Sequence, residues 1–413
     1  MNATDSVSID RRVSIISAER TNTGTAQASR HVSIDYLRAG ITLLVVAHHS
    51  ALAYTNFARF YPDAYLASTH PVVDPQRWDL LDYAENFNDV FFMSLMFCVS
   101  GIFVWPSLRR SGAMLFVVDR ARRLGIPFIV GIVFLMPLAY YASWNLTGHS
   151  VGFLAYWKQY LTIDGRPCGP LWFIWLLLLF DLLAAVGYRC FGPTIAQSER
   201  SPTKSRGPVY MAVAMFTLCA AVYLPALAAY GFGAWRAFVT GPFYFQTSRL
   251  ALYFAWFVFG IFIGRSGIRR GLLARDGALA RRWPTWVAVS IIAYNALEFL
   301  PAALSHWTAI RPEQRGLLEA MLWVTSCVSS CFAFLALFRG VVSKRHAWMD
   351  SMTRCAYGIY LVHYVYVLWM QRTLLDMSLP AAPKFLATFL VATAASWVTV
   401  RLLLKIPAVR DVL

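Results

Sequence analysis

The chain has 413 residues, of which 58% are hydrophobic and 14% charged, and its formal net charge is +16 at pH 7. Soluble domains carry about 25% charged residues, so this composition excludes most soluble folds and indicates an integral membrane protein. The basic residues lie in short tracts between apolar runs rather than on one folded surface, which argues against a nucleic-acid-binding protein.

The first 36 residues are rich in Ser, Thr and Arg and have almost no apolar periodicity. Such a composition predicts that residues 1–36 form a disordered cytoplasmic tail. A cleavable secretory signal is not expected, because the first apolar run starts only after this tail and continues into His48, His49 and Tyr54.

Ten apolar runs follow, each close to the length of about 20 residues that a membrane-spanning helix needs. These runs are too long and too continuously apolar for barrel strands. We therefore predict an all-α polytopic membrane protein with about ten transmembrane helices over residues 37–404 and a short cytoplasmic tail over residues 405–413. The predicted spans are Leu37–Tyr54, Asn88–Trp105, Leu124–Ala142, Leu171–Cys190, Pro208–Tyr230, Ser248–Gly264, Pro284–Leu304, Leu317–Phe338, Thr353–Trp369 and Phe385–Leu404.

Lys and Arg are divided unequally between the two sides of this predicted bundle. The two tails and the four loops on their side hold 27 of the 37 basic residues, and the five opposite loops hold 10. Because basic residues are retained in the cytoplasm, both termini are predicted to be cytoplasmic. The net charge then follows from membrane orientation and does not indicate an acidic partner.

The first span carries Arg38 at its cytoplasmic end and two histidines near its middle. Eleven residues at about 100° each return to within roughly 20° of the starting face, so His49 lies above Arg38 at about 16 Å, whereas His48 is rotated away. Asp35 lies three residues before Arg38, within reach of an ion pair. A neutral imidazole inside the membrane is suited to be a general base. The alternative is structural: His49 bonds a neighbouring helix and Arg38 anchors the span.

Arg120 and Arg123 stand at the cytoplasmic end of the third span. They share one helical face, and guanidinium groups bind phosphate oxygens through paired hydrogen bonds. This pair therefore predicts a site for a phosphorylated cytosolic ligand. The alternative is topological, because cytoplasmic loops carry arginine for orientation alone, and the loop at 265–283 has six arginines.

The other spans hold fewer polar residues. Ser100, near the inner end of the second span, is more typical of close helix packing than of chemistry. Asp181 in the fourth span is expected to make a structural hydrogen bond. His363 in the ninth span follows Tyr360 at helical spacing, which fits either an aromatic packing stripe or a polar pocket. No metal site is expected, because the Cys327–Cys331 pair has no converging His or carboxylate.

Several motifs occur in a specific order along the chain. They are Asp35-Tyr-Leu-Arg38 followed by His49, Ser100–Gly101, Arg120-x-x-Arg123 leading into Gly-Ile-Pro127, Leu171-Trp172-Phe173-Ile174 and Ile359-Tyr360-Leu361-Val362-His363. Together they resemble the integral-membrane acyltransferase family three, whose members acylate extracytoplasmic glycans with cytosolic acyl-coenzyme A (acyl-CoA). The Asn88–Asp89 pair, the Arg-x-x-Arg-x-Gly-Ile-Pro and Tyr-Leu-Val-His sequences and Ile406–Pro407 are similar to the branch that succinylates periplasmic glucans.

The resemblance implies a multi-pass O-acyltransferase of the bacterial cytoplasmic (inner) membrane. It implies transfer of an acetyl or succinyl group from acyl-CoA, which is a substrate rather than a bound cofactor, to a hydroxyl of a glycan or similar acceptor. The implied site residues are catalytic His49, Arg38 and Asp35, donor-binding Arg120 and Arg123, and pocket residues Ser100, Trp172, Tyr360 and His363.

The implied mechanism keeps the phosphates of the donor at the cytoplasmic arginines while its pantetheine arm reaches the depth of His49. That imidazole takes the proton of the acceptor hydroxyl, and the oxygen attacks the thioester; Tyr360 or His363 is expected to stabilise the oxyanion. Direct attack and an acyl-histidine intermediate both fit the sequence.

A transporter for a polar or lipid-linked solute is the alternative function, with Arg38, Asp181 and His363 along its path. The absence of a convincing internal repeat between residues 37–230 and 248–404 argues against it.

Overall fold

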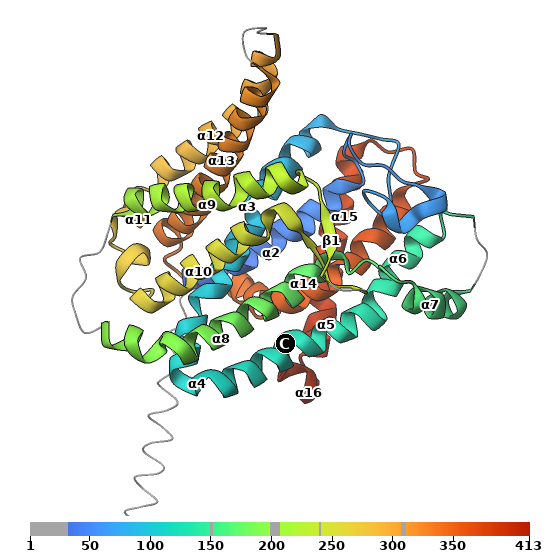
Figure 1. The fold of residues 1–413 in the computed structure, drawn as a ribbon. Helices are drawn as coiled ribbons and strands as arrows, with labels where there is room; N and C mark the ends of the chain where they lie inside the picture. The colour runs from blue at the N-terminus through green and yellow to red at the C-terminus, as the bar shows by residue number, and fades with distance from the viewer. Residues whose placement is uncertain (1–31, 149–151, 199–206, 239–240, 307–310) are drawn as a thin grey trace, which may run out of the picture.

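The computed structural model describes residues 32–148, 152–198, 207–238, 241–306 and 311–413, and these form a bundle of helices (Figure 1). Every predicted span falls on helical structure, which confirms the all-α polytopic fold. The helices concerned are α2 (Val32–Leu52), α3 (Asp79–Ile102), α4 (Val104–Arg120), α5 (Ile126–Val130), α6 (Met136–Trp144), α8 (Trp172–Ser198), α9 (Pro208–Tyr230), α10 (Leu250–Ser266), α12 (Trp283–Ala303), α13 (Pro312–Val341), α14 (Ala347–Leu374) and α15 (Ala381–Leu403). The cytoplasmic position of both termini stays a prediction.

Shorter elements connect these helices. They are α7 (Phe153–Thr162), α11 (Ala278–Arg281), α16 (Pro407–Arg410), the 3₁₀ turns at Pro62–Ala67, Gly169–Leu171, Thr247–Arg249, Gly271–Leu273 and Leu304–His306, and the antiparallel strands β1 (Trp235–Ala237) and β2 (Tyr244–Gln246).

The predicted N-terminal tail differs from the structure at its inner end. Residues 1–31 lie outside the described residues, but α2 begins at Val32, inside the predicted tail, because the side chains of its first turn are packed. Ile34 is fully buried, and the Tyr36 hydroxyl donates a hydrogen bond to Asp350 Oδ1 at 2.9 Å. At the other end, α15 ends at Leu403, as expected for the predicted tail 405–413, and these last residues contain α16 and place Val412 and Leu413 against the bundle.

Helix α2 runs through the interior of the bundle and packs against α3, α13, α14 and α15 (Figure 1). Among the described residues, seven helical stretches are long and apolar enough to cross a membrane: Val104–Trp144, Gly169–Gly192, Pro208–Tyr230, Thr247–Ser266, Trp283–Ala303, Pro312–Val341 and Ala381–Leu403. The helices α2, α3 and α14 are not among them, because they carry more charged and polar side chains. Many of the polar side chains on these three helices are buried, among them Thr42 of α2, Glu85 of α3 and His363 of α14.

Two glycines allow α3 and α10 to pack backbone against backbone. A Cβ added to Gly260 would lie 2.0 Å from the carbonyl oxygen of Cys98, and one added to Gly101 would lie 2.2 Å from that of Phe257. Small residues permit such close approach in membrane helices. This contact fixes the end of α3 that carries Ser100, the residue before Gly101.

The stretch from Val104 to Trp144 is helical but not straight. Gly112 has φ +75° and interrupts α4, and a glycine adopts this conformation at little cost. Two π-helical turns follow, at Ala121–Gly125 and Gly131–Leu135, and Pro127 and Pro137 stand just after them. Proline lacks the backbone donor of a regular helix, and wide π turns are frequent at functional sites. The first π turn contains Arg123.

The long connection between α2 and α3, residues 53–78, is tied to the C-terminal helices. Asp74 and Lys384 form an ion pair at 2.7 Å, and both side chains are 1% exposed. The His70 ring bonds Gln371 Oε1 at 2.9 Å, and the amide nitrogen of Gln371 donates to the His49 carbonyl, also at 2.9 Å. These contacts hold the connection against α14 and α15 near His49.

Candidate active site

A cavity of about 280 Å³ lies at the Arg38 end of the bundle, among α2, α3, α4, α8 and α14. The residues that line it come from six segments far apart in the sequence, including the C-terminal one. They are Arg38, Ile41, Thr42, Met96, Val99, Ser100, Phe103, Arg120, Arg123, Leu124, Phe173, Leu177, Asp181, Ala356, Tyr357, Tyr360, Val412 and Leu413. The cavity combines apolar walls with a few charged groups, as small-molecule sites commonly do.

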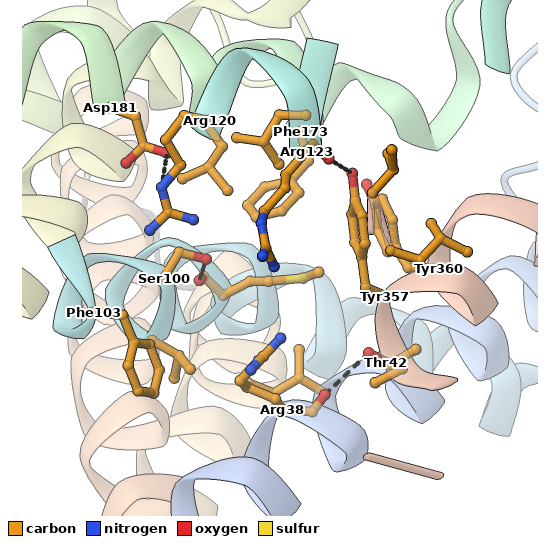
Figure 2. Close-up of a pocket in the computed structure, with 18 residues that line it drawn as sticks. Arg38, Thr42, Ser100, Phe103, Arg120, Arg123, Phe173, Asp181, Tyr357 and Tyr360 are labelled. Atoms are coloured by element: carbon orange, nitrogen blue, oxygen red, sulfur yellow. Dashed lines mark hydrogen bonds and ion pairs between the residues drawn. The ribbon is translucent and has the colours of Figure 1, made fainter. Parts of the chain in front are cut away.

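Three arginines give this cavity its charge. Figure 2 shows the guanidinium groups of Arg38, Arg120 and Arg123 pointing into the same space from α2, from the end of α4 and from the π turn that follows it. Asp181 of α8 is the acidic residue among those that line the cavity, and its Oδ2 lies 3.3 Å from Arg120 Nε. Among the side chains that line the cavity three are cationic and one is anionic, which favours an anionic ligand.

The acidic partners of Arg120 and Arg123 contact the Nε atoms of these side chains, and the terminal guanidinium nitrogens point into the cavity (Figure 2). Asp181 contacts Arg120 through Nε, and its side chain is only 2% exposed. Asp119 accepts a hydrogen bond from Arg123 Nε at 2.9 Å. The Tyr357 hydroxyl donates to the carbonyl oxygen of Arg123 at 2.7 Å and thereby ties the π turn to α14.

His49 lies beyond the inner end of this cavity, within the bundle. Its ring centroid is 5.3 Å from that of His363 and 5.1 Å from that of Tyr364, both on α14, and 5.2 Å from that of His48. His49 is partly buried, and its Nδ1 is buried without a hydrogen-bond partner among the described residues. The ring therefore faces protein, as the helical geometry predicts for a residue on the Arg38 face of α2.

His363 has a defined tautomer. Its Nδ1 lies 2.7 Å from the Tyr360 carbonyl oxygen, and since a carbonyl only accepts, Nδ1 carries the proton. The Nε2 of neutral His363 is therefore a lone-pair acceptor, and it has no hydrogen-bond partner among the described residues. The Tyr360 hydroxyl in turn donates to the Pro170 carbonyl. Neither group has a free donor proton in this arrangement, so the expected oxyanion role of Tyr360 or His363 is not supported.

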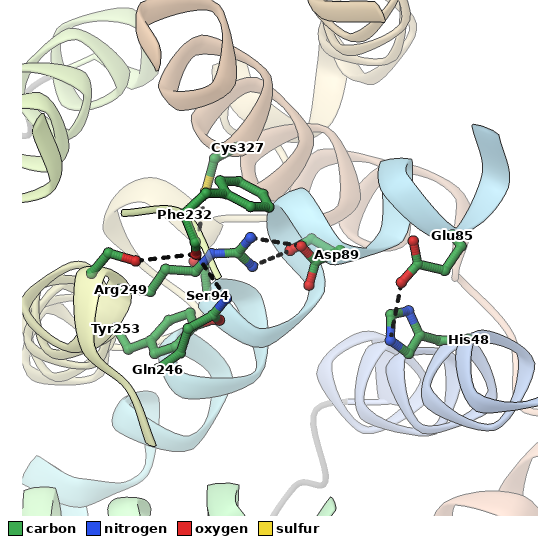
Figure 3. Close-up of polar contacts among 10 residues, drawn as sticks. His48, Glu85, Asp89, Ser94, Phe232, Gln246, Arg249, Tyr253 and Cys327 are labelled. Atoms are coloured by element: carbon green, nitrogen blue, oxygen red, sulfur yellow. Dashed lines mark hydrogen bonds and ion pairs between the residues drawn. The ribbon is translucent and has the colours of Figure 1, made fainter. Parts of the chain in front are cut away.

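His48 faces the opposite neighbour, α3 (Figure 3). Its Nε2 lies 3.5 Å from Glu85 Oε1, and both side chains are almost fully buried. One turn further along α3, Asp89 pairs with Arg249 at 2.7 Å. These contacts join α2, α3 and the start of α10, and they assign the two adjacent histidines of α2 to different surroundings.

The structure brings together five of the nine predicted site residues and places four elsewhere. Arg38, Ser100, Arg120, Arg123 and Tyr360 line the cavity, whereas Asp35, His49, Trp172 and His363 do not. His49 is about 10 Å further along α2 than Thr42, the last α2 residue in the lining. The cavity alone therefore does not reach the imidazole, which lies past Tyr360 and His363.

Two of these four residues are displaced for simple geometric reasons. Trp172 and Phe173 are adjacent on α8 and point about 100° apart; Phe173 lines the cavity, and Trp172 packs on Trp235 and Tyr253 with centroids at 5.5 and 5.6 Å. Asp35 lies within the first turn of α2 rather than outside the helix, and it is not among the residues that line the cavity.

Three contacts were not predicted from the sequence: Asp181 with Arg120, Glu85 with His48, and Gln371 with the His49 carbonyl. Asp181 was expected to have a structural partner, but the sequence did not indicate Arg120. Glu85 was missed because it lies before the predicted second span, whereas α3 begins at Asp79 and includes it. Gln371 carried no motif. The only available signal was an uncompensated polar residue within or beside an apolar run.

Comparison with protein families decides the identity of the fold. A family model described as an acyltransferase domain matches residues 31–401, nearly the whole chain. The chain belongs to acyltransferase family three. It is thus a membrane acyltransferase, and the alternative of a transporter is set aside. Comparisons with curated proteins and with solved structures give no match.

Proposed function

We propose that this acyltransferase moves an acyl group from cytosolic acyl-CoA to a hydroxyl of an extracytoplasmic glycan or similar acceptor, in the cytoplasmic membrane of a bacterium. The observation that carries the proposal is the cavity lined by Arg38, Arg120 and Arg123, whose inner end at Tyr360 is followed by His363 and His49. This arrangement supports an anionic donor at one end of α2 and a proton acceptor deeper in the bundle.

Two features support acyl-CoA as the donor: the charge of its phosphates and the length of its pantetheine arm. The phosphates of CoA match guanidinium groups, which bind phosphate oxygens through paired hydrogen bonds. The pantetheine arm is narrow and uncharged, which fits the apolar side chains that line the cavity, among them Ile41, Phe173 and Leu177. Arg38 and His49 are about 16 Å apart along α2, so a donor held by its phosphates presents its thioester near the imidazole.

The chemistry assigned to His49 is general-base catalysis. The imidazole takes the proton of the acceptor hydroxyl, the oxygen forms a bond to the thioester carbonyl carbon, and the carbon–sulfur bond breaks. The CoA thiolate leaves toward the cytosolic side and takes up a proton there. His363 Nε2 lies on the neighbouring ring as a second acceptor for the proton held by His49. An acyl-histidine intermediate remains the alternative route, and rapid-quench detection of labelled protein distinguishes the two.

Purified protein in nanodiscs, incubated with acetyl-CoA or succinyl-CoA and a glucan acceptor, tests the proposal. We expect release of free CoA together with labelled glucan, and succinyl-CoA is the first donor to compare because of the motif resemblance. Release of CoA with neither donor, under conditions where the protein is folded, would refute the function.

The variant Arg120→Ala with Arg123→Ala tests the donor site. We expect a higher KM for the donor with little change in the KM for the acceptor. Arg269→Ala with Arg270→Ala is the matched control, because these arginines are exposed in another loop on the same predicted side. A larger effect on acceptor use would remove Arg120 and Arg123 from the donor site.

A further inference from the structure

A second hollow adjoins the donor cavity on its outer side. It has a volume of about 430 Å³ and is lined by Ser107, Arg110, Ser111, Leu115, Phe116, Asp119, Arg120 and Arg123. Arg120 and Arg123 line both spaces, so the two are neighbours that share these side chains. The sequence motifs did not assign Arg110, Ser107 or Ser111 to any site.

The break in α4 at Gly112 creates this hollow. Gly112 has φ +75° and ψ +165°, outside the helical region, so the chain turns between Ser111 and the rest of the helix. The hollow is lined both by residues before this turn, Ser107, Arg110 and Ser111, and by residues after it, from Leu115 to Arg123.

The hollow has an excess of positive charge. Three arginines line it, and the acidic residue that lines it, Asp119, accepts a hydrogen bond from Arg123 Nε at 2.9 Å. Phe116 lies beneath Arg120, with the guanidinium carbon 5.0 Å from the ring centroid, and holds it at the boundary between the two spaces. Arg110 is exposed and lines only the outer hollow. The guanidinium groups therefore continue from Arg38, through Arg120 and Arg123, out to Arg110.

We infer that the outer hollow binds the 3′-phosphorylated adenosine end of the donor and that Arg110 contacts the 3′-phosphate. This inference rests on the proposed acyl-CoA donor. The inner cavity adjoins the residues next to His49, so it takes the arm that carries the thioester, and the nucleotide is left to the outer hollow beside it. The shared pair Arg120 and Arg123 meets the diphosphate that joins the arm to the nucleotide. The 3′-phosphate is assigned to Arg110, because this arginine lines the outer hollow and not the inner cavity.

The other surfaces of the hollow fit a nucleoside. Leu115 is 64% exposed and offers an apolar face to the base. The Ser111 hydroxyl donates to the Ser107 carbonyl at 2.9 Å, which leaves its oxygen as an acceptor for a ribose hydroxyl or a base amine. A lipid headgroup offers phosphate chemistry as well, and the experiment separates the two sources.

The test compares two donors that differ only in the 3′-phosphate, acyl-CoA and acyl-3′-dephospho-CoA. For the wild type we expect kcat/KM to be about tenfold or more higher with acyl-CoA, the size of a hydrogen bond between charged groups. Arg110→Ala is expected to lower kcat/KM for acyl-CoA to the value for the dephospho donor and to leave the dephospho donor unchanged. Arg109→Ala is the matched control, since Arg109 is the adjacent exposed arginine and does not line the hollow.

Each outcome decides between named alternatives. Equal losses for both donors in Arg110→Ala, or a wild type that does not distinguish them, would overturn the inference while leaving the acyl-CoA function intact. A loss that occurs only in vesicles containing phosphatidylglycerol, and equally for both donors, assigns the hollow to a lipid headgroup and overturns it as well.

Direct binding keeps the test independent of turnover. Adenosine 3′,5′-bisphosphate, titrated into the full-length protein, is expected to raise the melting temperature of the wild type and of Arg109→Ala but not of Arg110→Ala. Equal stabilisation of all three proteins would refute the contact with Arg110. If neither donor releases CoA in the activity assay, that result refutes the proposed function, and the binding experiment still tests the contact with Arg110.

Discussion

The two adjacent histidines of α2 permit a sharp test, because they face different helices. We predict that His49→Ala abolishes most acyl transfer, whereas His48→Ala acts mainly on stability. His49 contacts His363 and Tyr364 on α14, and His48 contacts Glu85 and Phe92 on α3. The two changes remove the same side chain one residue apart, so each is the control for the other.

The expected magnitudes differ in kind. A general base contributes about 10²–10⁴-fold to a rate, so His49→Ala should lower kcat by this factor, or about 3–5 kcal/mol in activation free energy. His48→Ala removes the partner of Glu85, whose side chain is 8% exposed, and an unsatisfied buried group costs about 1–3 kcal/mol of folding free energy. We expect its kcat to stay within about tenfold of the wild type because His48 does not contact His363 or the cavity.

The assay is release of free CoA from labelled acyl-CoA, with thermal unfolding of each variant in the same detergent. Glu85→Gln should share the stability loss of His48→Ala but not the activity loss of His49→Ala. The assignment is refuted if His49→Ala retains turnover, or if His48→Ala is inactive while its melting temperature is unchanged.

Three further predictions concern the scaffold. Gly260→Ala should separate α3 from α10 and lower the melting temperature strongly, because its Cβ would lie 2.0 Å from a carbonyl oxygen; Gly187→Ala, whose Cβ meets nothing within 4 Å, is the control and should be neutral. Lys384→Met should cost about 3–5 kcal/mol of unfolding free energy, because it removes the positive charge that pairs with the buried Asp74 carboxylate. The addition of Asp74→Leu should restore much of this loss in a denaturation series. Burial lowers the pKa of His70 from 6.5 to about 4, so on acidification the unfolded chain binds the proton before the folded one does. The free energy of unfolding should therefore fall by about 3 kcal/mol as the pH drops from above 6.5 toward 4. His70→Gln should flatten this part of the pH–stability curve, and an unchanged slope would contradict the burial argument.

The fold could largely be predicted from the sequence, because a segment that crosses a bilayer must be a helix of about 20 mainly apolar residues. The predicted span Pro208–Tyr230 coincides with α9. The second predicted span begins too late: α3 starts at Asp79 rather than Asn88, since the first turns of this helix carry acidic residues that no apolar window includes. Glu85 lies in those turns, and its pairing with His48 was therefore missed.

The site could be predicted in its charges but not in its extent. Motif order and helical spacing selected Arg38, Arg120 and Arg123, which line one cavity. The position of His49 beyond the cavity follows from where Tyr360 and His363 of α14 meet α2, and spacing within α2 does not contain this information. The outer hollow at Arg110 depends on a single glycine conformation in α4.

The sequence by itself determined the helical fold and the ends of the bundle where arginine gathers, because apolar length and helical periodicity act within one segment. Only the tertiary structure decided which polar groups meet: Arg120 with Asp181, His48 with Glu85, and the three guanidinium groups with each other. The physical reason is that such contacts depend on the rotation and crossing of separate helices. These are set by packing against neighbours such as the one at Gly260, and no single segment encodes them.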